Sequence, residues 1–346
     1  MNRDELIDKI RKLSRGETAE DMVLAEILVS HGCYAMLRQI PSWKMQATVM
    51  QAVNYQMLKK RYEFCEPVFA ELVNIPHAVI KGAVLSDRIF GNPAYRKSGD
   101  IDLLVSPQYY EEVEMLLKRY GFVQGRLVAN KIVPYTRQER IYQRMYSHQA
   151  PAFIKQTDNS ICPFINVDVN LDIYWGESTT RVDMEEFLCH TEDRKVFGVD
   201  VQTLCPVYEC ISLCMHHYKD FNSLYLLSGG EISLSLFTDL YGYFTVVHPD
   251  AVELKQVCDR FGVTEYISFC IWHTEQIFHS KILRQYLDMI PPVEDMLYRI
   301  GLSETEYKIL DGGVSGALFD ADFSDRLKAM LTEQDRKKIE INKMYM

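Results

Sequence analysis

Two aspartates separated by one residue, Asp100 and Asp102, are the feature of this sequence that most directly suggests chemistry. Apolar residues 103–105 follow them and Pro107 ends the run, so the pair should open a β-strand. Side chains at i and i+2 of a strand point to the same side, about 6–7 Å apart, and can bridge two divalent cations about 3.5–4 Å apart. Without metal the carboxylates repel each other, so exchange of Asp102 for asparagine should leave the fold equally stable or more stable. Taken alone, the pattern also occurs at solvated loop-to-strand junctions.

A glycine turn lies upstream of the aspartates. Residues 77–80 form a short apolar run that predicts a buried strand, and Lys81-Gly82 ends it. Glycine lets the backbone approach a phosphate closely because it has no Cβ. A helix is expected over residues 84–90, and the amides at the start of a helix favour an anion. The order of strand, glycine turn and paired aspartates therefore suggests a site for a phosphorylated ligand.

A third carboxylate is expected on a later strand. Residues 165–175 alternate between apolar and polar side chains, and the polar face carries Asp168, Asn170 and Asp172. Asp168 and Asp172 would be about 13 Å apart along a strand, so only one of them can join the first pair. Alternation does not choose between them. Asp172 lies beside an expected turn at Gly176, where open space for an acceptor is easier to provide.

These motifs together resemble the little-characterised nucleotidyltransferase family of the DNA polymerase β superfamily, over residues 77–124 and the later strand. The family pattern runs through an apolar strand, Lys-Gly, a helix, Tyr and Arg, then D-I-D-L-L-V and a further helix. In this sequence the pattern is carried by Ile80-Lys81-Gly82, Tyr95-Arg96 and residues 100–105. The later strand of the family ends D-L-H-W, and Asp172-Ile173-Tyr174-Trp175 stands there, which favours Asp172 as the third carboxylate. Tyrosine replaces the histidine, and Ala83 stands where the superfamily usually has serine or glycine.

The resemblance implies an α/β fold with a polymerase-β-type nucleotidyltransferase core and a mixed sheet, flanked by N-terminal helices and a helical C-terminal domain. It implies transfer of a nucleoside monophosphate from a nucleoside triphosphate such as ATP to a hydroxyl of a small molecule, peptide or protein, with Mg²⁺ or Mn²⁺. The implied metal and catalytic ligands are Asp100, Asp102 and Asp172, and the implied nucleotide-binding residues are Lys81, Gly82 and Arg96. Lys81 and Arg96 carry the charge that suits a triphosphate. Ala83 keeps open a catalytically silent nucleotide-binding or regulatory module on the same fold, and a phosphohydrolase or a scaffold remains as a further alternative.

Length and composition add limits on the class of protein. The 346 residues have room for about two domains, and the pattern along the chain predicts an N-terminal helical segment (1–72), a nucleotidyltransferase core (73–205) and a helical C-terminal domain (206–346). Strand-rich structure is expected after Gly121, through Ile141 and Tyr146. A net charge of −10 argues against a long nucleic-acid acceptor. No signal-peptide pattern and no apolar run of about 20 residues occur, so a cytoplasmic protein with no membrane contact is expected.

The C-terminal helices carry a weaker resemblance to the same family through His216, Lys219 and Asp239. The polar stripe that contains His216 and Lys219 either faces solvent or lines a cleft opposite the metal site. Cys210, Cys214 and His217 lie at neighbouring positions on one side of a helix, but no second ligand pair has the spacing of a zinc site. The nine cysteines are therefore expected to be reduced thiols without zinc.

Overall fold

The structure is a computed structural model that describes residues 2–176, 178–230, 232–303 and 305–345. The chain forms two compact units, one of residues Gln51–Glu209 and one of Met1–Met50 together with Cys210–Met346. We call them the sheet unit and the helical unit. Residues 51–72 thus belong with the sheet, and residues 1–50 belong with the C-terminal helices. The three segments expected from the sequence remain a prediction.

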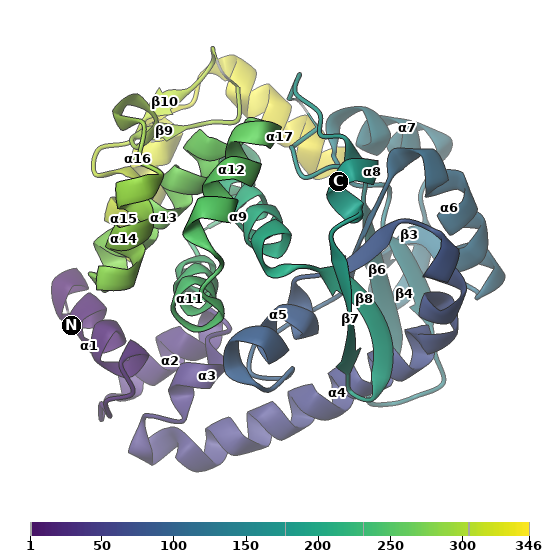
Figure 1. Ribbon diagram of the computed structural model, residues 1–346, viewed down its shortest axis with the longest axis horizontal. Coiled ribbons are helices and arrows are strands. Elements are labelled where there is room, and N and C mark those ends of the chain that lie inside the picture. The colour runs from purple at the N-terminus through teal and green to yellow at the C-terminus, as the bar shows by residue number, and fades with distance from the viewer. Residues whose placement is uncertain (1, 177, 231, 304, 346) are drawn as a thin grey trace. The chain divides into compact units, whose positions relative to one another are not determined.

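The sheet unit contains the strands that carry the aspartates (Figure 1). Its elements are α4 (Lys44–Glu71) from Gln51 onward, η2 (Leu72–Asn74), β1 (His77–Ile80), α5 (Gly82–Phe90), β2 (Ile101–Val105), η3 (Pro107–Tyr109), α6 (Tyr110–Arg119), β3 (Val123–Val128), β4 (Lys131–Pro134), α7 (Arg137–Tyr146), β5 (Phe153–Gln156), β6 (Phe164–Asn170), α8 (Met184–Leu188), β7 (Thr191–Val196), β8 (Val199–Leu204) and the first turn of α9 (Pro206–Asn222).

Six of these strands form one sheet in the order β1-β2-β6-β5-β3-β4. The pair β2 and β6 is parallel, and the remaining described pairs of this sheet are antiparallel. The expectation of an α/β fold with a mixed sheet is therefore confirmed. Strands β7 and β8 form a separate antiparallel hairpin.

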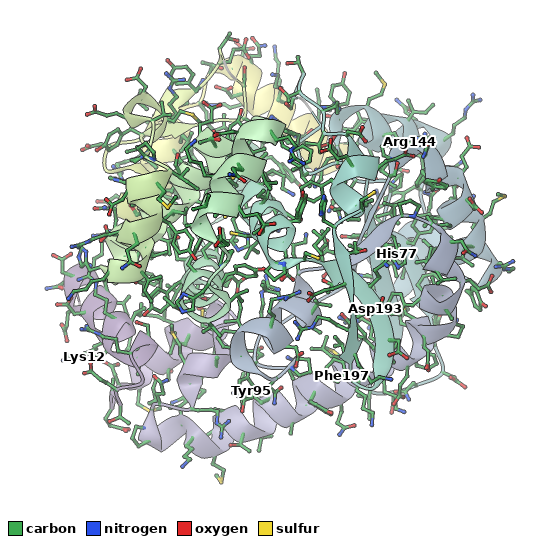
Figure 2. All side chains as sticks on the ribbon, viewed as in Figure 1. Lys12, His77, Tyr95, Arg144, Asp193 and Phe197 are labelled. Atoms are coloured by element: carbon green, nitrogen blue, oxygen red, sulfur yellow. The ribbon has the colours of Figure 1, made fainter. Side chains whose placement is uncertain are left out.

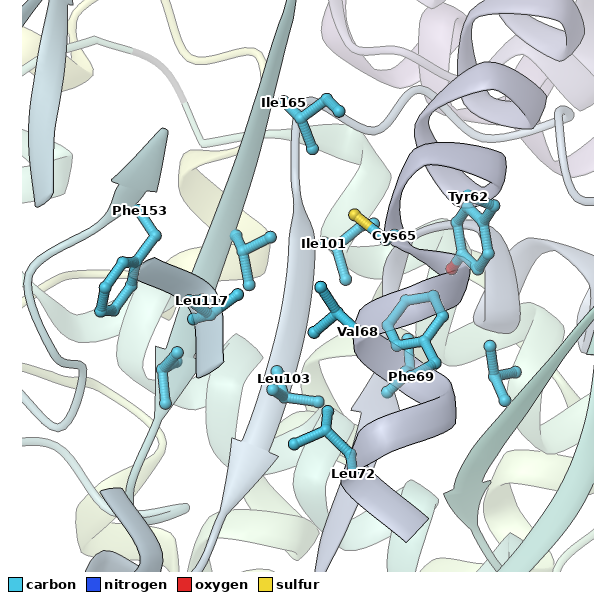
Figure 3. Packing of buried hydrophobic residues seen from close by; sticks show 14 of the residues in the cluster. Tyr62, Cys65, Val68, Phe69, Leu72, Ile101, Leu103, Leu117, Phe153 and Ile165 are labelled. Atoms are coloured by element: carbon cyan, nitrogen blue, oxygen red, sulfur yellow. The ribbon is translucent and has the colours of Figure 1, made fainter. Parts of the chain in front are cut away.

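One face of the sheet is apolar and packs against helices α4 and α6. Figure 3 shows Ile101 and Leu103 of β2 beside Tyr62, Cys65 and Phe69 of α4. Leu117 of α6, Phe153 of β5 and Ile165 of β6 belong to the same buried cluster. Because side chains alternate along a strand, the residues between these apolar positions point to the opposite face of the sheet. That opposite face is where the aspartate of β2 must lie.

Residues 137–146 are helical, so the prediction of strand-rich structure through Ile141 and Tyr146 is wrong there. The side chain of Thr136 accepts from the Glu139 amide, and the Glu139 side chain accepts from the Thr136 amide, which closes a capping box at the start of α7. This T-x-x-E spacing is a sequence signal for a helix start. The aromatic and β-branched residues that suggested strands lie inside the helix that it begins.

Strand β6 ends at Asn170, before the end of the alternating run predicted to reach Trp175. The Leu171 amide donates to the His148 carbonyl at 2.9 Å, and Gln149 forms an isolated bridge with Asn170. The antiparallel contacts with the segment that leads into β5 thus end at Leu171. Asp172 consequently lies in the loop beyond β6.

The helical unit is built from both ends of the chain. Its elements are α1 (Arg3–Ser14), α2 (Met22–Ser30), α3 (Tyr34–Leu37), η1 (Pro41–Trp43), the first residues of α4, α9 from Cys210 onward, α10 (Leu224–Leu227), α11 (Leu234–Gly242), η4 (Tyr243–Val247), α12 (Ala251–Phe261), α13 (Thr264–Phe278), α14 (Lys281–Met289), η5 (Glu294–Met296), β9 (Arg299–Ile300), β10 (Lys308–Ile309), α15 (Gly313–Ala317), α16 (Phe323–Met330) and α17 (Glu333–Tyr345). Arg3 donates to the Ser315 carbonyl at 2.7 Å, which ties α1 to α15. Within the described residues, every helix is too short or too polar to cross a membrane.

Candidate active site

The register of the sheet brings two aspartates together. Asp102 on β2 and Asp168 on β6 are direct partners in the parallel pair. Their neighbours Leu103 and Val169 are also partners, and both belong to the apolar cluster. The two aspartates therefore point to the opposite face, from strands about 4.8 Å apart. Asp102 is buried, whereas Asp168 is half-buried.

Lys81 is the immediate counter-ion of Asp102. Its Nζ lies 2.7 Å from Asp102 Oδ1, and both side chains are almost entirely buried. Lys81 has φ 56° and ψ −148°, a backbone region that is essentially restricted to glycine. Holding a lysine there costs about 1–3 kcal/mol. This backbone conformation places the ammonium group directly beside Asp102.

Gly82 begins α5 and lies against the loop that leads into β2. A Cβ on Gly82 would lie 3.0 Å from Ser98 Oγ and 4.0 Å from the Asp100 carbonyl oxygen. Ser98 Oγ in turn donates to the Asp100 carbonyl at 3.0 Å. The turn after β1 and the approach to the aspartates are thus packed so closely that a Cβ on Gly82 would require Ser98 to shift.

Helix α4 holds this loop from the other side, a role that the sequence did not predict. Arg61 donates to the Ser98 carbonyl at 3.1 Å and lies 3.5 Å from that of Asp100. Asn54 donates to the carbonyl of Ala94 at 2.9 Å and to that of Arg96 at 3.0 Å. Both are buried polar residues, seven positions apart on a helix whose neighbouring positions are apolar. Polar residues at this helical spacing on a buried face are the signal that could have indicated them.

Asp100 lies at the entrance to β2 in an environment that opposes its charge. Burial raises the pKa of the Asp100 carboxyl, and the nearby Asp102 raises it further. The positive charges of Lys81, Arg61 and Arg96 act in the opposite direction. The structure therefore brings together Asp100, Asp102 and both cations expected to bind a triphosphate.

Asp172 is engaged by its own loop. Its Oδ1 accepts from the Tyr174 amide at 2.9 Å, and Oδ2 lies 3.9 Å from Arg181 Nε. Burial raises the pKa of the Asp172 carboxyl, against the effect of the backbone amide of Tyr174 and the charge of Arg181. Asn170, and not Asp172, is the residue of this segment that contacts Asp102, since its Nδ2 lies 3.3 Å from Asp102 Oδ1. The strand pairing thus favours Asp168 over Asp172 as the third carboxylate beside Asp102.

The residues expected to line a cleft, His216, Lys219 and Asp239, all lie in the helical unit. His216 Nε2 and Lys219 Nζ both approach Asp220, at 3.3 Å and 3.6 Å. Asp239 instead lies 3.5 Å from Nε2 of the fully buried His217. Within this unit His216 and Lys219 therefore share a partner that Asp239 does not contact at these distances, and the role of the three residues in a cleft stays a prediction.

Metal binding is compatible with the donor atoms on the polar face of the sheet. Carboxylate oxygens are the ligands that Mg²⁺ and Mn²⁺ prefer, and Asp100, Asp102 and Asp168 supply them from two strands and one strand entrance. Among the described residues, no three His, Cys, Asp or Glu side chains are already gathered around a common metal position. The Lys81 ammonium takes up one oxygen of Asp102, so a cation that binds there must displace it.

A family described as uncharacterised nucleotidyltransferase matches residues 23–279. The matched range includes the whole sheet unit and every candidate site residue named above. No curated protein matches the chain.

Proposed function

The chain belongs to the uncharacterised nucleotidyltransferase family, and from this premise we propose that it transfers a nucleoside monophosphate from a nucleoside triphosphate to an acceptor hydroxyl. The acceptor oxygen forms a bond to the α-phosphorus and loses its proton. The bond between the α-phosphorus and the oxygen that bridges it to the β-phosphate breaks, and pyrophosphate leaves. The acceptor belongs to a small molecule, a peptide or a protein. The sheet unit would then be a polymerase-β-type core.

The pairing of Asp102 with Asp168, next to Asp100 and the Gly82 turn, is the observation that carries this proposal. It supplies three carboxylates on one face of the sheet, with a glycine turn and two cations close to them. We assign the third carboxylate to Asp168 instead of Asp172, because Asp168 is in register with Asp102 and Asp172 supports its own loop.

The residues of the site act mainly by position and charge. Gly82 allows the triphosphate to approach the backbone amides at the start of α5, which carry partial positive charge. Lys81 and Arg96 would bind phosphate oxygens. Asp100, Asp102 and Asp168 would hold Mg²⁺ or Mn²⁺, whose charge neutralises the triphosphate and the leaving pyrophosphate. Asn54 and Arg61 keep the loop of Arg96 and Asp100 in place.

A catalytically silent nucleotide-binding module is the second candidate, and the Lys81–Asp102 ion pair favours it. A buried ammonium on Asp102 can stand in for a cation and leave the carboxylate without metal. Ala83 also supplies no hydroxyl for a phosphate. In this second case the module would bind triphosphate without releasing pyrophosphate.

Incubation with α-labelled and γ-labelled triphosphates, Mg²⁺ and no added acceptor distinguishes these functions. A transferase that leaks to water releases nucleoside monophosphate and pyrophosphate slowly, whereas a phosphohydrolase releases inorganic phosphate. Asp168→Asn should lower monophosphate release by several orders of magnitude, and the matched Asp172→Asn should retain most of it. Triphosphate binding without pyrophosphate release in the wild-type chain would support the silent module. Loss of transfer only in Asp172→Asn would reverse our assignment of the third carboxylate.

A further inference from the structure

The β3–β4 hairpin and α7 form a surface, residues 125–148, whose charge is opposite to that of the chain. We call it the hairpin–helix face. It carries five cationic side chains, Arg126, Lys131, Arg137, Arg140 and Arg144. Its one carboxylate, Glu139, is buried and pairs with Arg126 at 2.6 Å. A chain of net charge −10 thus presents a local cluster of positive charge.

Helix α7 has the reverse of the usual distribution of polar and apolar side chains. Glu139 and Gln143 are 9% and 6% exposed and point inward, whereas Ile141 and Met145 are 48% and 63% exposed. The inward face is polar because Glu139 closes the capping box and Gln143 hydrogen-bonds to Tyr135. A surface helix normally buries its apolar side chains. The outward face of α7 therefore exposes apolar surface among arginines.

The hairpin continues this surface. Val128 and Val133 share a face of the hairpin with Arg126 and are 48% and 39% exposed, whereas Leu127 points to the other face. β4 is the last strand in the order of the six-stranded sheet, and within the described residues it pairs with β3 alone. The outer edge of such a strand can accept the backbone of an extended segment.

The cations of this face are available for an anionic partner. Arg137, Arg140 and Lys131 make no ion pair with any described residue. Arg144 lies 5.1 Å from the centroid of the Tyr110 ring, which orients its guanidinium without neutralising it. Figure 2 shows the side chains along α7 and labels Arg144. An acidic partner would therefore meet positive charge that the fold itself leaves uncompensated.

The kinds of residue on this face indicate the kind of partner. Interfaces between proteins are enriched in arginine, methionine and aromatic residues and depleted of lysine, glutamate and aspartate. Surfaces that bind single-stranded nucleic acid instead combine cations with aromatic side chains on which bases stack. Here the exposed large apolar side chains are mainly aliphatic, namely Val128, Val133, Ile141 and Met145, and one aromatic side chain, Tyr146, is 46% exposed among them. Aliphatic surface beside arginines fits a polypeptide better than it fits bases.

We propose that the hairpin–helix face is a docking surface for an extended acidic polypeptide segment that also carries apolar side chains. The carboxylates of the segment would contact Arg137, Arg140 and Arg144, and its apolar side chains would cover Ile141 and Met145. The face belongs to the same sheet as the candidate site, since β3 pairs with β5 and β5 pairs with β6, which carries Asp168. Docking of this kind goes beyond nucleotidyl transfer and does not depend on it.

The test is fluorescence anisotropy with the full chain, no nucleotide and no metal. The probe is a labelled peptide of about 12 residues that alternates glutamate with leucine or valine, and a peptide of the same length with lysine in place of glutamate is its control. The acidic peptide should bind at least about tenfold more tightly, and its affinity should fall when salt is raised, because exposed charges are screened.

Two sets of variants locate the binding. Exchange of Arg137, Arg140 and Arg144 for glutamate should lower the affinity for the acidic peptide at least about tenfold. If the glutamate variant does not fold, exchange of the same residues for glutamine should also lower this affinity. The control exchanges Lys337, Lys338 and Lys343 of α17 for glutamate, which changes the net charge by the same amount and should leave the affinity unchanged.

Three results would overturn the proposal. The first is an acidic peptide that binds no more tightly than the lysine peptide, or that binds the arginine variants as tightly as it binds the wild-type chain. The second is tighter binding of a single-stranded oligonucleotide of similar length and charge that is lost in the same variants, which would assign the face to nucleic acid. The third is a wild-type dimer in light scattering that becomes monomeric in the arginine variants, which would make a second copy of the chain the occupant.

Discussion

Exchange of Asp102 for asparagine should destabilise the sheet unit, contrary to the sequence-based expectation that it leaves the fold equally or more stable. That expectation considered only the repulsion between Asp100 and Asp102. In the structure Asp102 also pairs with Lys81 at 2.7 Å, and the two side chains are 10% and 7% exposed. Removal of one partner from a buried ion pair costs about 3–5 kcal/mol, because the other charge is left buried without compensation. Asp100 compensates part of the lysine charge, so we expect about 3 kcal/mol.

Urea unfolding can measure this loss in the sheet unit alone. The three tryptophans are Trp43, Trp175 and Trp272, and only Trp175 belongs to the sheet unit. In a background with phenylalanine at the other two positions, its fluorescence reports that unit. With a slope of about 1–3 kcal/mol per molar urea, a loss of about 3 kcal/mol lowers the midpoint by roughly 1–3 M.

A double-mutant cycle tests the cause. Lys81→Met combined with Asp102→Asn removes both charges, so neither member of the pair is left as a buried charge without compensation. Most of the lost stability should therefore return, and the two single exchanges should be strongly non-additive. An unchanged midpoint for Asp102→Asn, or no recovery in the double variant, would refute the reasoning.

Three further predictions concern the same site. The pKa of Asp100 is raised in the fold, so the folded state disfavours the charged carboxylate, and Asp100→Asn should raise the melting temperature at neutral pH. The gain in melting temperature should disappear as the pH falls below the ordinary aspartate range, where the carboxyl is neutral in both states. A gain that persists at low pH would contradict this cause. Gly82→Ala should weaken triphosphate binding and lower stability, because the new Cβ meets Ser98 Oγ and the φ of +47° is strained for alanine, as binding titrations and thermal melts would show. Triphosphate with Mg²⁺ at about 100 times its dissociation constant should stabilise the chain by about 2.7 kcal/mol, and an equal thermal shift in the presence of a chelator would argue against metal-dependent binding.

The sequence by itself was sufficient for the family and for the local elements of the site. The paired aspartates, the Lys81-Gly82 turn and the alternation of residues 165–169 are local patterns, because strand periodicity and glycine turns depend on neighbours in the chain. They predicted the strands β1 and β2, and the family resemblance predicted the mixed α/β sheet. The T-x-x-E signal at the start of α7 was equally local. The strand prediction for this segment failed because it gave the aromatic and β-branched residues more weight than this helix-start signal.

Only the tertiary structure decided which residues meet. Strand register depends on partners far apart in the chain, and a shift by an even number of residues preserves the alternation of side chains, so alternation had no means to distinguish Asp168 from Asp172. The family motif favoured Asp172, because a local match contains no information on register. The pairing of β2 with β6 places Asp168 beside Asp102. The ion pair with Lys81 arises in the same way, because the turn after β1 and the strand β2 come together only on folding.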